Sequence, residues 1–280
     1  MYIVRFKIPS QDFSKQVVSF FILEGSLNLQ VIEPQDQNLI FQVEFKNFDP
    51  HKIINNFKKI FPNINLELIF EKKVDYEEWK RTRLKSLEVG IFKFKPIFEK
   101  LETDNEEFIY LDTLIGAFGT DQHPTTVICL EFLNDYKEEI KKSTSIAVDF
   151  GTGNGILSLA LWKIGIPQII AIEIFYNYCL EAKRNFIINK ALNAKVINFS
   201  SMKIIKQLDL LVANVPFSTF KDKESSVLES NFKIAIFSGI RKEKEDDLLR
   251  EFKIRKIVVE DLRERDNWLG FLVKKDNEVG

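Results

Sequence analysis

The chain has 280 residues, of which 45% are hydrophobic, so it can bury a sizeable core in one large domain or two smaller ones. Its formal net charge is −1 and the charges are interspersed, which argues against the broad basic face of proteins that bind phosphate backbones. No stretch approaches the roughly 20 apolar residues of a membrane span, and residues 1–9 lack the apolar core of a signal peptide. We therefore expect a soluble, unprocessed protein that contacts neither nucleic acid nor membranes.

The cysteines and histidines are too few and too scattered for a disulfide or a metal site. Cys129 and Cys179 stand singly in apolar helical patterns, as buried cysteines of a reducing compartment do. His51 and His123 have no cysteine pair near them, so a zinc site would need an unusual set of ligands. We expect a cytoplasmic protein without a metal.

The first 71 residues carry alternating and helical hydrophobic patterns in the order β-α-β-β-α-β. The segments are 2–8, 12–23, 27–33, 38–46, a helix from Pro50 to the residue before Pro62, and 64–70. Asp49 is the expected N-cap of the second helix, with Pro50 at its first position. This order predicts a small ferredoxin-like domain with two helices on one face of a sheet. It contains no cluster of reactive side chains, so we interpret it as a substrate-recognition domain.

Residues 72–107 differ in composition, with a local excess of basic side chains around Trp79. We predict a linker helix and a connecting segment here. The charged residues fit a solvated helix face as well as a docking surface, and both interpretations stay open.

Residues 108–280 alternate strands and helices in the manner of a doubly wound sheet. The predicted strands are 146–150, 169–174, 195–199, 208–213, 233–238, 253–260 and 268–274. The predicted helices are 124–140, 156–164, 176–190, 222–230 and 241–250. Since no helical pattern separates the last two strands, we expect them to pair antiparallel, unlike the strands of an all-parallel dinucleotide-binding fold.

A glycine-rich loop follows the first of these strands. Three of the 11 glycines fall within residues 151–155, where the backbone must turn tightly and let a ligand approach closely. The next strand ends at Glu173, where a carboxylate can accept hydrogen bonds from both hydroxyls of a ribose. The sequence therefore predicts a cofactor that contains a nucleoside.

The spacing of the loop favours S-adenosyl-L-methionine over a dinucleotide. The loop has the form GxGxG, without the additional residue by which the dinucleotide motif seats a pyrophosphate. The strand that ends near Ala213 continues into Asn214-Val215-Pro216-Phe217, a turn with an amide and an aromatic ring that suits amine methylation. By itself, this turn fits an ordinary strand end and loop start equally well.

Residues 114–126, LIGAFGTDQHPTT, resemble the Phe-Gly-Thr-Gly-x-His-Pro-Thr-Thr signature of the PrmA-type methyltransferases, which modify large-subunit ribosomal protein eleven. The resemblance covers nearly the whole chain and is most specific between residues 116 and 240. It implies a Rossmann-like class I methyltransferase sheet, mostly parallel with an antiparallel last strand, behind a small α+β ferredoxin-like domain. It also implies S-adenosyl-L-methionine as cofactor and a ribosomal protein as partner.

The resemblance assigns roles to individual residues. Together with the glycine loop, it gives the cofactor contacts as Thr126, Gly151, Gly153, Glu173 and Asn214, with Phe118 closing over the cofactor. We assign Asn214 the catalytic role of orienting the amine, and no side chain the role of obligatory general base. Thr126 also suits plain hydrogen bonding at a helix N-terminus, and His123 suits a structural role in the loop.

This chain departs from the family pattern at three places. Asp121 stands where the signature has Gly, Phe175 replaces an acidic residue two positions after Glu173, and Val215-Pro216-Phe217 replaces an Ile-Leu continuation. Three alternatives remain open: methylation of another protein lysine or a small-molecule amine, a nicotinamide-dependent oxidoreductase, and a non-catalytic binding protein. We expect a monomer.

Overall fold

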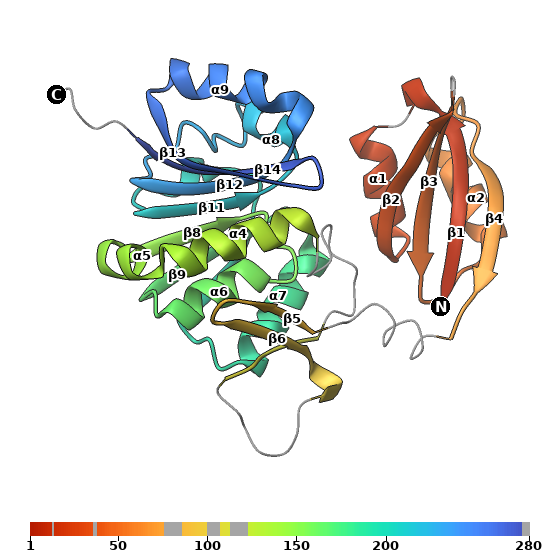
Figure 1. Ribbon diagram of the computed structural model, residues 1–280. Coiled ribbons are helices and arrows are strands. Elements are labelled where there is room, and N and C mark those ends of the chain that lie inside the picture. Colours follow the sequence, from red (N-terminus) through yellow and green to blue (C-terminus); the bar gives the residue numbers. More distant parts are fainter. Residues whose placement is uncertain (13, 36–37, 76–85, 100–106, 113–122, 276–280) are drawn as a thin grey trace. The chain divides into compact units, whose positions relative to one another are not determined.

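The computed structural model describes residues 1–12, 14–35, 38–75, 86–99, 107–112 and 123–275 (Figure 1). These residues form two compact units, one before residue 76 and one from residue 86 onward. Within the described residues, no helix is long and apolar enough to cross a membrane.

The first unit is a four-stranded antiparallel sheet with two helices. Its elements are β1 (Tyr2–Pro9), α1 (Lys15–Leu23), β2 (Ser26–Gln35), β3 (Asn38–Phe45), α2 (Pro50–Ile60) and β4 (Glu67–Lys73). The strand order is β2-β3-β1-β4, with every neighbouring pair antiparallel. The predicted ferredoxin-like fold is confirmed, including Asp49 as N-cap of α2, where its side chain accepts from the Lys52 amide at 3.1 Å.

The core of this unit lies on one face of the sheet because alternate residues of β1 and β3 point to that face. Val4 pairs with Val43 and Phe6 with Phe41, and all four are buried. Phe20 of α1 meets Phe57 of α2 edge-to-face, with ring centroids 5.2 Å apart. Both helices therefore cover the same face, as the sequence predicted.

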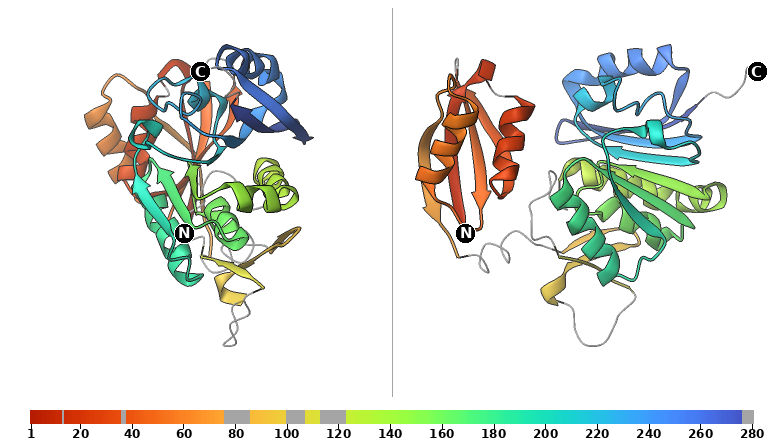
Figure 2. Two further views of the ribbon diagram at one scale, coloured as in Figure 1. Left: turned by 90° about the vertical axis from the view of Figure 1, so that its left-hand side faces the viewer. Right: turned by 180° about the vertical axis from the view of Figure 1, so that it is seen from behind.

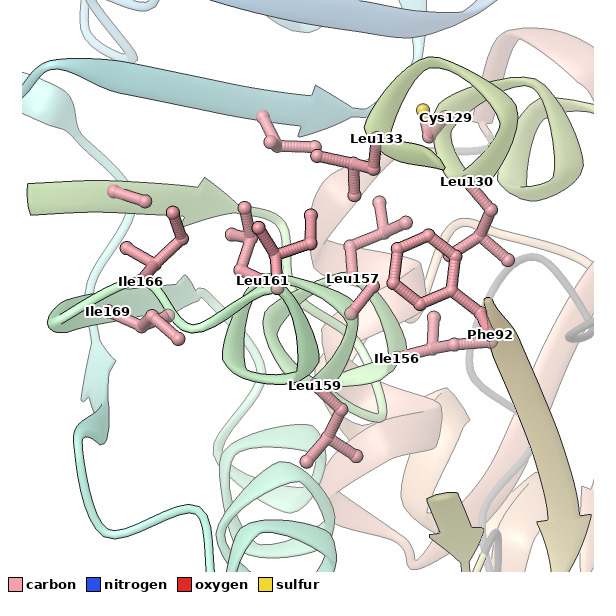
Figure 3. Packing of buried hydrophobic residues seen from close by; sticks show 14 of the residues in the cluster. Phe92, Cys129, Leu130, Leu133, Ile156, Leu157, Leu159, Leu161, Ile166 and Ile169 are labelled. Carbon is pink, nitrogen blue, oxygen red and sulfur yellow. The ribbon is translucent and has the colours of Figure 1, made fainter. Parts of the chain in front are cut away.

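The segment between residues 86 and 112 differs from the predicted division into 1–71, 72–107 and 108–280. Its described residues form a small sheet of β5 (Leu87–Val89), β6 (Phe92–Pro96) and β7 (Ile109–Leu111), which belongs to the second unit. Phe92 and Phe94 are buried, and Phe92 lies among Leu130, Ile156 and Leu157 (Figure 3). This part is strand rather than linker because the two rings alternate with lysines and bury in the second core. The rest of the predicted linker helix falls on residues 76–85 and 100–106, outside the described residues.

The second unit is built on a seven-stranded sheet. Its helices are α4 (Pro124–Asp135), α5 (Lys137–Ser143), α6 (Ile156–Ile164), α7 (Tyr176–Ile188), α8 (Phe217–Lys221) and α9 (Glu245–Ile254). Its strands are β8 (Ile146–Phe150), β9 (Gln168–Glu173), β10 (Ala194–Asn198), β11 (Leu210–Asn214), β12 (Ile234–Arg241), β13 (Ile257–Arg265) and β14 (Trp268–Lys275). The order is β10-β9-β8-β11-β12-β14-β13.

The first five strands in this order are parallel, whereas β14 runs antiparallel to both of its neighbours. Asp266 and Asn267 join β13 to β14 with φ values of 50° and 62°, which suit a tight hairpin turn. The predicted antiparallel pairing of the last two strands is confirmed.

Helices cover both faces of this sheet because successive residues of each strand point to opposite sides. Ala147 of β8 packs in the core beneath α4 and α6, whereas Val148 packs in the core beneath α8 and α9. Figure 2 shows the green helices α6 and α7 on one side of the sheet and the blue helix α9 on the other.

Two predicted helices of this unit need correction. The helix over 124–140 is two helices, because Tyr136 leaves helical backbone angles with φ −100° and ψ 12°. The helix predicted over 222–230 was wrong: a short helix lies earlier, at α8, and turns follow it. In these turns Ser225 and Ser230 donate hydrogen bonds to nearby backbone carbonyls, which competes with helix formation.

Candidate active site

The glycine loop between β8 and α6 takes backbone angles that suit glycine. Gly151, Gly153 and Gly155 have φ values of 76°, 56° and 89°. A Cβ on Gly151 would lie 2.5 Å from Cγ1 of Val215, which belongs to the turn after β11. The loop therefore abuts the turn that carries Asn214.

A buried carboxylate holds this loop from beneath. Asp149, at the end of β8, is fully buried and accepts hydrogen bonds from the hydroxyls of Thr152 at 2.6 Å and Ser158 at 2.7 Å. Burial raises the pKa of Asp149, and the two hydroxyls oppose that rise. No role is predicted for Asp149 from the motifs, although an acidic residue at the end of a buried strand is a visible signal in the sequence.

Glu173 lies at the end of β9, as predicted, and contacts the glycine loop. Its Oε2 accepts from the Gly153 amide and its Oε1 from the Phe175 amide, both at 3.0 Å. The side chain is buried, and desolvation raises its pKa against the effect of these amides. Among the described residues its side-chain partners are backbone amides, so each oxygen keeps a lone pair for a further donor.

Asn214 ends β11 and meets the first turn of α4. Its Nδ2 donates to the Thr126 hydroxyl at 3.4 Å, across 88 residues of sequence. The turn after it packs closely on β12: the Val215 amide donates to the Ser238 carbonyl at 3.2 Å, and a Cβ on Gly239 would lie 2.2 Å from the Val215 carbonyl oxygen. Five predicted site residues, Thr126, Gly151, Gly153, Glu173 and Asn214, thus lie along the carboxyl edge of the parallel strands.

The structure describes two of the three departures from the family pattern. Asp121 lies outside the described residues, as does Phe118, the residue predicted to close over the cofactor. Phe175 is the N-cap residue of α7 but has no side-chain capping bond, and its ring packs edge-to-face on Tyr178. Phe217 begins α8, where the Lys221 and Lys244 ammonium groups lie 5.7 and 5.9 Å from its ring centroid.

These features together define a Rossmann-like class I methyltransferase fold. The glycine loop follows β8, an acid ends β9, a polar turn ends β11, and the antiparallel β14 separates this sheet from the all-parallel dinucleotide-binding type. In the part of the chain that the structure describes, no three His, Cys, Asp or Glu side chains are close enough to hold a metal ion.

Comparison with known proteins identifies the family. The family model for ribosomal protein L11 methyltransferase (PrmA) matches residues 23–276, so the chain belongs to this family. Similar relatives include ribosomal protein L11 methyltransferases of Aquifex aeolicus, 28% identical over 98% of this chain and 99% of the relative, and of Dictyoglomus thermophilum, 29% identical over 87% and 83%. The resemblance found in the sequence is confirmed, and the oxidoreductase alternative is not favoured.

A solved structure supports the fold. The ribosomal protein L11 methylase of Lactobacillus delbrueckii subsp. bulgaricus matches 66% of this chain and 95% of its own with a TM-score of 0.55 and 22% sequence identity.

Proposed function

We propose that this protein transfers methyl groups from S-adenosyl-L-methionine to amino groups of ribosomal protein L11, on lysine side chains, the N-terminal α-amine or both. Membership of the family and the names of the relatives support this substrate. The structural observation that carries the proposal is the contact between Thr126 and Asn214 beside the glycine loop. Because both cysteines are free and buried, we expect the protein to act in the cytoplasm.

The residues at the carboxyl edge fit this cofactor. Glu173 offers a carboxylate with spare acceptor capacity for a ribose diol, and Gly151 and Gly153 leave the loop free of Cβ atoms. Thr126 and Asn214 would hold its methionine end. S-adenosyl-L-methionine supplies an electrophilic methyl group on a sulfonium centre. Phe118 keeps the covering role that the family resemblance implies.

Asn214 orients the attacking amine in this proposal. Its Nδ2 is engaged with the Thr126 hydroxyl, so its Oδ1 is the atom that accepts from an N–H of the substrate. At neutral pH, presenting a neutral amine costs about 4.6 kcal/mol for lysine and about 1 to 1.4 kcal/mol for an α-amine. Desolvation and fixed orientation of the lone pair offset this cost, and no side chain is needed as an obligatory base.

We expect Asn214→Ala to keep the fold and much of the cofactor affinity but to lower turnover by about a hundredfold or more, because the amine loses its orienting acceptor. Methyl transfer to purified L11 at saturating substrate measures this. Thr126→Val and Thr126→Ser are a matched pair, since only the serine variant keeps the hydroxyl that Asn214 contacts. Equal turnover of wild type and Asn214→Ala would remove Asn214 from the mechanism.

Two simpler experiments test the class and the target. Thermal shift with S-adenosylhomocysteine should stabilise the protein, whereas NAD should not. Mass spectrometry of ribosomal proteins from cells with and without the gene should show L11 lighter by multiples of one methyl group in the deletion. If the mass of L11 is the same in both cells and the mass of another protein changes, that protein is the target instead of L11.

A further inference from the structure

His123 organises the first turn of α4, the helix that carries Thr126. It is the N-cap residue: its ring Nδ1 accepts from the Thr125 amide at 3.4 Å and lies 2.8 Å from the Thr125 hydroxyl. Its carbonyl accepts from the amides of Thr126 at 2.9 Å and Val127 at 3.1 Å. The position of Thr126 therefore depends on His123 directly through the backbone carbonyl and indirectly through the ring, which holds the preceding residue Thr125.

The ring of His123 packs against one residue of the sheet, Trp268, which in turn contacts Arg241. It packs edge-to-face on Trp268 with centroids 5.0 Å apart, and the Arg241 guanidinium lies 4.0 Å from the centroid of the Trp268 ring. These contacts join the ends of β12 and β14 to the start of α4. The His123 ring thus lies between Trp268 and the first turn of α4, which it caps.

We propose that His123 is a positioning residue whose neutral ring holds Thr126 against Asn214, so that protonation of the ring weakens cofactor binding and slows methyl transfer. The acceptor role requires an unprotonated Nδ1, which places the ring proton on Nε2. A protonated Nδ1 becomes a donor and can no longer accept from the Thr125 amide. This inference rests on the proposed function, because its consequence is read at the cofactor site.

The surroundings of the ring favour its neutral form. Burial lowers the pKa of His123 below its ordinary value, and the charge of Arg241 lowers it further. The other charged groups on the packed elements are two acids of α4, Glu131 and Asp135, which pair with Arg265 and Arg263 of β13. Lys274 and Lys275 lie at the opposite end of β14 from Trp268, and Asp266 lies in the hairpin turn. Both effects favour the neutral ring over the protonated form.

Burial also raises the pKa values of two carboxylates of the site, Asp149 and Glu173, so their titration can contribute to the same pH profile. The test must therefore compare variants rather than a single profile. His123→Asn keeps a capping acceptor that does not titrate, and His123→Ala removes the acceptor. His51 is exposed on α2 in the first unit, so His51→Asn is the matched control.

Calorimetry with S-adenosylhomocysteine, run from about pH 8 down through the midpoint of the His123 titration that NMR determines, measures the effect. At the upper end, where the ring is neutral, we expect His123→Asn to match wild type within about twofold and His123→Ala to bind about fivefold more weakly. Towards the acid end, wild type should lose affinity about fivefold more than His123→Asn, and His51→Asn should follow wild type. Since the chain has only two histidines, NMR resolves the titration of each ring directly.

An identical pH profile for wild type and His123→Asn would overturn the proposal, and that comparison decides even if His123→Ala does not fold. An ordinary or raised pKa for His123 in the NMR titration would also overturn it. If wild type does not bind S-adenosylhomocysteine at any pH, the proposed function fails. If wild type binds but the variants show no difference, only the role of His123 fails.

Discussion

Two carboxylates of the candidate site, Glu173 and Asp149, differ in what they contact. Glu173 braces the glycine loop through the Gly153 amide and still presents acceptor lone pairs at the end of β9. Asp149 is fully buried, and one of its oxygens accepts hydrogen bonds from the hydroxyls of Thr152 and Ser158. In the proposed function Glu173 therefore binds the ligand as well as the loop, whereas the fully buried Asp149 only supports the loop.

At this scale we predict that Glu173→Ala weakens binding of S-adenosylhomocysteine by roughly tenfold to a hundredfold, because the ribose loses charge-assisted hydrogen bonds. Calorimetry well below the melting temperature of both proteins measures it, since the Gly153 amide also loses its acceptor and stability falls. Glu138→Ala, an exposed change on α5, is the control. An unchanged dissociation constant would reject the assignment of Glu173 to the ribose.

The parallel strands carry the site at their carboxyl ends and are tied together at their amino ends. Asp209, just before β11, accepts from the amides of Ser145 at 2.8 Å and Ile146 at 3.1 Å, and its Oδ1 lies 2.7 Å from the Lys233 ammonium. Lys233 and these hydrogen bonds lower the pKa of Asp209. One side chain thus links β8, β11 and β12, the strands whose far ends bear Gly151, Asn214 and Ser238.

We predict that Asp209→Ala lowers the free energy of unfolding of the second unit by about 1 to 3 kcal/mol, because two backbone amides lose their acceptor. Lys233→Met removes only a largely exposed ion pair and should cost less than about 1 kcal/mol. Urea unfolding compares the two variants. Equal losses would mean that the ion pair, rather than the link to the backbone amides, is what matters.

On the scale of the whole molecule, the two units have separate cores, so each unfolding signal must be assigned to one of them. Trp162 and Trp268 both lie in the second unit. The first unit is filled largely by phenylalanine rings. The third tryptophan, Trp79, lies outside the described residues, so in a Trp79→Phe background tryptophan fluorescence reports on the second unit.

We predict that titration of Asp149 contributes to the pH dependence of the free energy of unfolding of the second unit. A carboxyl group whose folded pKa is raised binds more protons in the native state, so it makes stability fall as pH rises from its unfolded pKa to its folded one. The slope can reach about 1.4 kcal/mol per pH unit. Asp149→Asn should remove this contribution, and the stability of wild type relative to the variant should decrease as pH rises through that window. Urea unfolding followed by tryptophan fluorescence measures it; a difference that stays constant or grows would contradict the assignment.

Much of the architecture was predictable because it depends on neighbours in sequence. Period-two and helical patterns predicted the strands and most helices, Asp49 marked a helix start, and the glycine loop together with Glu173 marked the ligand edge. The helix predictions failed where tertiary packing competes with the local pattern. Phe92 and Phe94 lie in strand and are buried in the second core, and Val227 and Leu228 are buried in turns instead of a helix.

The sequence by itself determined most of the elements, the family and the residues predicted for the site, since these follow from short periodicities and motifs. Only the tertiary structure decided which of those residues meet. Thr126 contacts Asn214, and Val215 packs on Gly151 and Gly239, because parallel strands bring their carboxyl ends to one edge whatever their distance along the chain. His123 packs on Trp268 because the antiparallel β14 begins at that same edge.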